Sequence, residues 1–354
     1  MKNPSSRGAL TWRGVLTRLA ISAGSLVVFF IGLDLVLRFW LSDPHKVPGG
    51  IQGPNYQGIS RPSSDPLLAK ELIPGANGVV NASGYMGTDY PPERSPGTFR
   101  IVGLGDSITM YFSAERENYL YIAEQILRRE PGAPRAEALN FGVGAYDTSM
   151  EVHQFETRGS RYRPDLVTVG YCINDGIDFP YTVNRATNRV TFAAEDSDSP
   201  PVFSFIERNL ATARADLTAE QFFRVAFASA AWNNSMRALE RLAALGREQH
   251  FAVVVLIFPV ITDFDHYLFA PYHERVRAVA TSLGMTVLDL LPAFRAAGAS
   301  GSLRQGRDYI HPNAIGHRAA GEALARTILQ AGLLGPGGRA PLSDGGVEGA
   351  AAIP

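Results

Sequence analysis

The chain has 354 residues, of which 45% are hydrophobic and 19% charged, a composition typical of a packed globular protein rather than a disordered one. Its formal net charge of -1 gives no general reason to expect binding to nucleic acid. The single cysteine, Cys172, excludes an intramolecular framework of disulfides.

An apolar segment lies near the N-terminus, between Arg18 and Arg38. Its nineteen residues carry one charge, Asp34, and they reach about 28 Å as a helix, close to the roughly 30 Å hydrocarbon core of a bilayer. Basic residues are more frequent before the segment than after it, which predicts a transmembrane anchor over residues 19–41. Residues 1–18 are then cytoplasmic, and the rest of the chain is periplasmic or extracellular. A cleaved signal peptide is the alternative, but no small-residue cleavage site follows the segment.

Two other segments lack the pattern of a packed domain. Residues 42–97 hold nine of the 23 prolines and many glycines, so we expect a spacer and lead-in that partly wraps the next domain. Residues 334–354 have too few large apolar side chains to offset the entropy lost on ordering. We therefore expect a disordered tail.

Between these segments, residues 98–333 alternate between strand and helix patterns. The predicted strands are residues 100–104, 136–141, 165–171, 251–258 and 285–290, and the predicted helices are residues 117–130, 148–158, 232–248, 271–283 and 313–332. This alternation predicts an α/β fold with three layers, in which a doubly wound, five-stranded parallel sheet carries helices on both faces. Residues 178–231 break the alternation and are expected to be an insertion that forms a lid or a partner surface. Ligands of such folds bind at the carboxyl ends of the strands.

The first predicted strand ends in the sequence GDSIT. Gly105 permits a tight turn, and Ser107 is expected at the start of a helix, with its hydroxyl exposed and its N–H free of a helical partner. A phosphate-binding turn would need a glycine in place of Ile108, and the chain has no G-x-x-x-x-G-K-[ST] motif. A serine that only caps the helix remains the simpler alternative.

Further candidate groups follow three other predicted strands. Gly142, in NFGVGAYDT, allows close approach of the backbone, so that its N–H could point into a site; a plain turn is the alternative. Asn174, in INDG, carries an amide donor, although an Asx-turn would also explain it. His311 lies three residues after Asp308 and follows the fifth strand. This spacing lets the carboxylate reach the imidazole and leave Nε2 as a base.

Together these four blocks resemble the SGNH (GDSL-like) hydrolase family, over about residues 80–332. The lead-in before GDSIT also resembles membrane-anchored bacterial members of that family. The resemblance implies a catalytic triad and an oxyanion hole that holds the negative oxygen formed during ester cleavage. The triad would be Ser107, Asp308 and His311, and the oxyanion donors would be the Ser107 N–H, the Gly142 N–H and the Asn174 side chain. One departure is Cys172, which stands where the family usually has glycine in its third block.

Other reactive residues fit simpler interpretations. Cys172 lies at the end of an apolar strand, where a thiol usually packs as a small hydrophobe. Asp263, Asp265 and His266 lie close together without a second pair of ligands, and no metal or cofactor is expected. His317 is six residues past His311 and is expected at the surface of the last helix.

Three functions remain open from the sequence. The leading hypothesis is an esterase or lipase-type hydrolase that acts through an acyl-enzyme on esters of small molecules, lipids or acylated carbohydrates. An O-acyltransferase acting on envelope polysaccharide would use the same triad. A tethered binding module without catalysis is the non-enzymatic alternative.

Overall fold

The computed structural model describes residues 58–111, 114–177, 181–184, 189–192, 216–217, 219–306 and 309–334, with Trp12 and short helical pieces between residues 21 and 30. The chain forms two compact units. One consists of Met1–Gly50, Phe179–Val183 and Thr191–Asp216, and the other of Ile51–Asp178, Asn184–Val190 and Leu217–Pro354. The second unit carries the parallel sheet.

Several predicted segments fall largely outside the described residues. These are the cytoplasmic residues 1–18, most of the anchor at 19–41 and the tail beyond Leu334. Within the described part of the chain, no helix has the length and apolar character needed to cross a membrane.

The central sheet has five parallel strands in the order β10-β9-β5-β3-β4. They are β3 (Thr98–Gly105), β4 (Arg135–Asn140), β5 (Leu166–Tyr171), β9 (Ala252–Ile257) and β10 (Thr286–Asp289). Every residue of β3 and β5 is buried, because helices cover both faces of the sheet. All five predicted strands are present, and the predicted α/β fold is confirmed.

The strand order reverses between β3 and β5. The chain passes from β3 outward to β4 on one side, and from β5 through β9 to β10 on the other. With right-handed crossovers this reversal places α3 (Tyr119–Leu127) on one face of the sheet. The opposite face carries α4 (Thr148–Gln154), α7 (Ala230–Gln249) and α8 (Ala270–Ser282). In folds of this type ligands bind where the order reverses, which here is at the carboxyl ends of β3 and β5.

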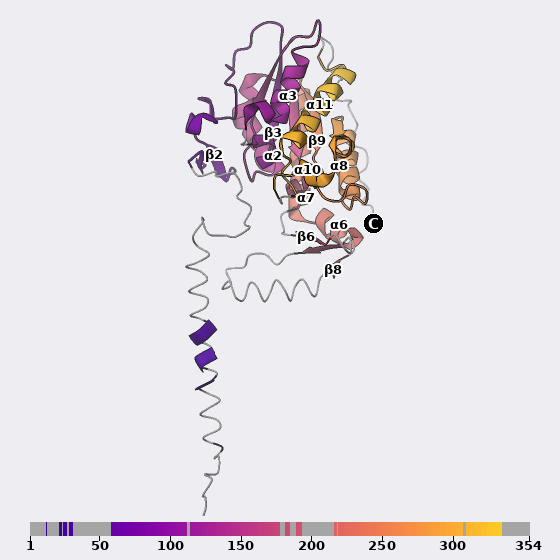
Figure 1. The fold of residues 1–354 in the computed structure, drawn as a ribbon. Coiled ribbons are helices and arrows are strands. Elements are labelled where there is room, and N and C mark those ends of the chain that lie inside the picture. Colours follow the sequence, from indigo (N-terminus) through magenta and orange to yellow (C-terminus); the bar gives the residue numbers. More distant parts are fainter. Residues whose placement is uncertain are drawn as a thin grey trace, which may run out of the picture. The chain divides into compact units, whose positions relative to one another are not determined.

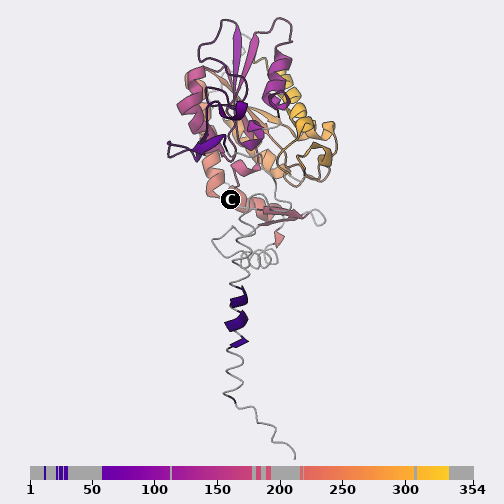
Figure 2. The same ribbon diagram turned by 60° about the vertical axis from the view of Figure 1, so that its left-hand side comes forward.

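The helices pack as two layers against this sheet. α11 (Ala314–Gln330) packs against α3 on one face (Figure 1). On the other face α4 packs against α7. Figure 2 shows helices on both sides of the sheet, with α11 in yellow on one side and α7 in salmon on the other. Their bounds are α2 (Ser107–Met110), α3 (Tyr119–Leu127), α4 (Thr148–Gln154), α7 (Ala230–Gln249), α8 (Ala270–Ser282), α9 (Leu291–Ala297), α10 (Ser300–Leu303) and α11 (Ala314–Gln330).

The predicted lead-in is a packed part of the second unit over its described residues, 58–97. It begins with a hairpin of β1 (Ser60–Pro62) and β2 (Lys70–Leu72). Met86 then pairs with Asn140, at the end of the edge strand β4. The buried apolar side chains of this segment form one cluster with residues around α2, and its members are Ile59, Leu68, Leu72, Val80, Met86, Met110, Val143 and Tyr146.

The predicted insertion at 178–231 is described only in part. Three short strands form a separate sheet in the order β6-β7-β8, with bounds Tyr181–Asn184, Arg189–Phe192 and Asp216–Leu217. The sequence patterns did not predict these strands. Helix α6 (Ala219–Phe227) buries Phe222 and Phe223, and the rings of Phe223 and Tyr272 lie 6.3 Å apart. Its apolar side therefore packs onto the sheet domain.

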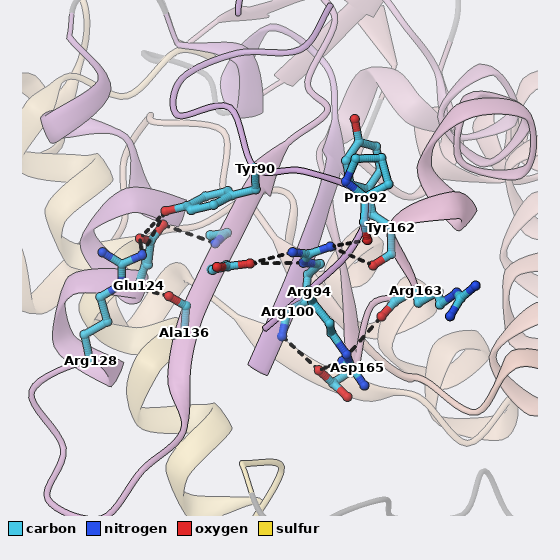
Figure 3. Close-up of polar contacts among 12 residues, drawn as sticks. Tyr90, Pro92, Arg94, Arg100, Glu124, Arg128, Ala136, Tyr162, Arg163 and Asp165 are labelled. Carbon is cyan, nitrogen blue, oxygen red and sulfur yellow. Dashed lines mark hydrogen bonds and ion pairs between the residues drawn. The ribbon is translucent and has the colours of Figure 1, made fainter. Parts of the chain in front are cut away.

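A fully buried arginine ties the lead-in to the sheet at the amino end of β3. The Arg100 guanidinium donates to Glu137 from Nη2 at 2.7 Å and to the carbonyl oxygens of Pro92 and Tyr162 at 2.9 and 3.2 Å (Figure 3). Its backbone N–H donates to Asp165 at 2.9 Å. Because a buried charge is tolerated only when it is paired and hydrogen-bonded, these contacts make Arg100 a structural residue.

We expect Arg100→Met to lower the free energy of unfolding by about 3–5 kcal/mol, because it leaves the Glu137 carboxylate buried without its partner. Denaturant unfolding measures the change. Arg94→Met is the matched control, since the Arg94 side chain is 36% exposed and pairs with Asp165 near the surface. The control should change stability by less than about 1 kcal/mol. An equal fall in the free energy of unfolding in the two variants would contradict the structural role of Arg100.

Candidate active site

The turn after β3 places Ser107 at the carboxyl edge of the sheet. Gly105 has φ 153, and a Cβ at this position would lie 2.0 Å from Thr109 Oγ1, so only glycine fits. Asp106 caps α2 by accepting the Ile108 N–H on Oδ1 at 2.8 Å. Ser107 is the first residue of the helix and is partly exposed.

The structure brings Ser107 and His311 together from positions 204 residues apart in the chain. Nε2 of His311 lies 2.7 Å from the Ser107 hydroxyl oxygen. The loop that carries the imidazole is anchored on both sides. The Gln305 N–H donates to the His311 carbonyl at 3.0 Å, and Asn313 caps α11 by accepting the Ile315 N–H at 3.0 Å. This is the geometry expected of a nucleophile and its general base.

Asp308, the predicted third member of the triad, lies outside the described residues. Its assignment stays a prediction.

Asn174 reaches the same place from β5. It lies in the short turn Ile173–Asp175, and its Nδ2 donates to Asp106 Oδ2 at 2.8 Å. Because Asp106 directly precedes Ser107, this bond connects the Asn174 amide to the turn that carries the hydroxyl. Asn174 is partly exposed, as Ser107 is.

Gly142 lies close to α2, but its N–H has a partner. A Cβ at Gly142 would lie 2.4 Å from the Met110 backbone nitrogen, so glycine lets this loop pack against the helix. The Gly142 N–H donates to Asn140 Oδ1 at 2.9 Å, and Asn140 Nδ2 donates to the Thr109 carbonyl at 2.8 Å. To serve an oxyanion the Gly142 amide would have to leave Asn140. Its predicted role therefore stays a prediction.

Two buried acidic residues, Asp175 and Glu151, lie near the site, and the sequence did not predict the burial of Glu151. Burial raises the pKa of Asp175 to about 8, with the charge of Asp106 as the next cause. Burial and the same carboxylates raise the pKa of Glu151, whose two side-chain oxygens have no partner among the described residues. Burial therefore favours the protonated form of the Glu151 carboxyl. A glutamate within an amphipathic helix gives no signal of this in the sequence.

His317 is buried, which corrects the prediction of a surface residue. The side chain is 0% exposed, and its ring centroid lies 3.9 Å from that of Tyr111. The helical spacing to Ala320 and Leu324, both also buried, places His317 on the face of α11 that packs inward, a signal present in the sequence. Burial lowers the pKa of His317 to about 3, so the ring is neutral.

The Asp263–His266 loop is a surface turn. Asp263 Oδ1 accepts the backbone N–H groups of Asp265 and His266 at 2.9 and 3.2 Å, and Oδ2 lies 3.2 Å from His266 Nδ1. Over the described ranges, no group of three or more His, Cys, Asp or Glu side chains is placed to hold a metal ion.

We expect His317→Phe to make the stability of the protein less sensitive to acid. The pKa of His317 is depressed from 6.5 to about 3 in the folded state, so the stability linked to its neutral ring is complete above pH 6.5 and declines as the pH falls toward 3. Denaturant unfolding at pH 7 and pH 4.5 measures this change. Between these two pH values the free energy of unfolding should fall less in the variant than in the unaltered chain. The control is His250→Asn, at an exposed left-handed position that asparagine tolerates. In this control the free energy of unfolding should fall between pH 7 and pH 4.5 as much as in the unaltered chain. An unchanged pH dependence in His317→Phe would contradict this account.

Comparisons with known proteins agree with the resemblance seen in the sequence. A family model described as the GDSL-like Lipase/Acylhydrolase family matches residues 104–319. No curated protein matches the chain. The solved structures that are similar include TesA, with 13% identity over 65% of this chain and 97% of that chain and a TM-score of 0.42. LAE5, an alpha/beta hydrolase enzyme from the metagenome of Lake Arreo, Spain, has 18% identity over 69% and 99%, with a TM-score of 0.42.

A catalytic mutant of Axe2, an acetylxylan esterase from Geobacillus stearothermophilus, has 15% identity over 65% of this chain and 94% of that chain, with a TM-score of 0.43. The family match spans more than half of the chain and includes both Ser107 and His311. This protein therefore belongs to the GDSL-like lipase/acylhydrolase family and is an ester-hydrolysing enzyme.

Proposed function

We propose that this protein is a serine esterase that cleaves carboxylic esters through an acyl-enzyme intermediate. The observation that carries the proposal is the 2.7 Å contact between Ser107 Oγ and His311 Nε2. A hydroxyl becomes a useful nucleophile when an adjacent base removes its proton, and His311 is in position to do so.

In the first half of the reaction, His311 takes the Ser107 proton and the serine oxygen attacks the ester carbonyl. The tetrahedral intermediate carries a negative oxygen, which needs preorganised donors. The proposed donors are the Ser107 N–H at the start of α2, the Asn174 side-chain amide and, after release from Asn140, the Gly142 N–H. As the intermediate collapses, His311 protonates the departing alcohol. Asp308, as the resemblance implies, would orient the imidazole.

In the second half, water enters in place of the alcohol. His311 removes a proton from the water, the resulting hydroxide attacks the acyl-enzyme, and the acid departs as His311 returns the proton to Ser107. The proposed substrates are esters of small molecules, lipids or acylated carbohydrates.

We also propose that residues 19–41 anchor the protein in a membrane, with the catalytic domain on the non-cytoplasmic side. What supports this is the length and apolar character of the segment and the excess of basic residues before it.

Ser107→Ala should abolish both turnover of p-nitrophenyl acetate and covalent labelling by a serine-directed phosphonate, because no other group replaces the attacking oxygen. His311→Gln should reduce the labelling rate by a factor of about 10²–10⁴, as expected for loss of a general base. Ser302→Ala is the matched control, since Ser302 is an exposed serine whose hydroxyl donates to the Ala299 carbonyl. It should leave both readouts unchanged. Wild-type turnover by Ser107→Ala would refute the proposal, and acyl transfer to an added sugar in excess of free acid would refute hydrolysis as the main reaction.

The full chain should sediment with membranes and require detergent for release, whereas a variant lacking residues 1–41 should remain in the supernatant. An alkaline phosphatase fused after residue 41 should be active, because that enzyme folds only outside the cytoplasm. Recovery of the full chain in the supernatant would contradict the proposed anchor.

A further inference from the structure

We propose that Cys172 is a positioning residue for catalysis, whose thiol fixes the orientation of the Asn174 amide. This inference rests on the proposed function, in which Asn174 donates to the oxyanion. It assigns a task to the one cysteine of the chain, which the reaction itself does not use.

The Asn174 amide is held at both ends. Its Nδ2 donates to Asp106 Oδ2 at 2.8 Å, and its Oδ1 accepts the Cys172 thiol proton. The two contacts select one orientation, because a carboxylate only accepts hydrogen bonds and must face the NH₂ group. The carbonyl end then needs a donor, and Cys172 Sγ supplies it.

This orientation decides what the amide presents to a substrate. An amide nitrogen carries two N–H groups, and Asp106 takes one of them. The other is available to an oxyanion formed at Ser107, the neighbour of Asp106 in the chain. A flipped amide would instead present its carbonyl oxygen, which repels a negative oxygen.

Cys172 is itself held firmly enough to act in this way. Its side chain is buried, with 2% of the residue exposed, and its backbone N–H donates to Asp175 Oδ2 at 2.7 Å. Sγ also lies 3.3 Å from Asp106 Oδ2, so the thiol contacts both groups that define the amide. Burial, reinforced by the nearby carboxylates, raises the pKa of the thiol, which therefore keeps the proton that it donates.

The test is a double-mutant cycle between Cys172 and Asn174, read as kcat and KM on p-nitrophenyl acetate. Cys172→Ala should lower kcat by about three- to tenfold, the value of one neutral hydrogen bond, with little change in KM. Asn174→Ala should lower kcat by about 10²–10³-fold, as for other oxyanion donors. In the Asn174→Ala background, Cys172→Ala should not lower kcat further, because the amide that Cys172 positions is gone.

Two more substitutions separate positioning from packing. Cys172→Ser keeps a donor and should restore most of kcat, whereas Cys172→Val fills the space without a donor and should lose kcat as Cys172→Ala does. If Cys172→Ala does not fold, the comparison of the serine and valine variants decides the question. Ser235→Ala is the matched control: it removes a buried hydroxyl that is bonded to Thr148 and Tyr171 rather than to Asn174, and it should leave kcat unchanged.

The outcomes distinguish this inference from the proposed function. If the unaltered protein is not labelled by the phosphonate at Ser107, the proposed function fails. If it is labelled, and Asn174→Ala is impaired while Cys172→Ala is not, the inference alone fails. The inference would also be overturned if Cys172→Ala lowered kcat by the same factor in the presence and in the absence of the Asn174 side chain.

Discussion

The active site depends on one buried carboxylate, that of Asp106. It accepts the Ile108 N–H and the Asn174 amide, and so joins the turn after β3 to the turn after β5. The Cys172 sulfur lies 3.3 Å from the same carboxylate. These strands are neighbours where the strand order reverses, which is why two segments distant in sequence end within hydrogen-bonding distance. A carboxylate is suited to this position because it accepts several hydrogen bonds at once and donates none.

The main features of the fold could be predicted from the sequence because burial on two faces leaves a simple pattern. A strand such as β5, covered on both sides, contains almost only apolar residues, and the helices between strands keep an apolar stripe. The approach of Ser107 and His311 was also predictable. Both follow strands of one parallel sheet, so both arrive at the same edge.

Other features depend on contacts that no local pattern encodes. The Gly142 amide donates to Asn140, and only the coordinates show that the side chain of Asn140 turns back on this loop. Glu151 and Arg100 look like surface residues by composition, yet both are buried. The lead-in was expected to be a spacer that partly wraps the next domain, but its prolines and glycines gave no sign of which residues pack. These residues interrupt regular structure without preventing close packing.

The packed lead-in has a consequence for where the enzyme begins as a folding unit. The family match starts at residue 104, but Ile59, Leu72 and Met86 belong to the same buried apolar cluster as Met110, at the end of the helix that carries the nucleophile. A fragment cut at the edge of the matched region would expose this apolar surface to water. A catalytic fragment that keeps this apolar cluster complete therefore has to include Ile59, well before the motif by which the family is recognised.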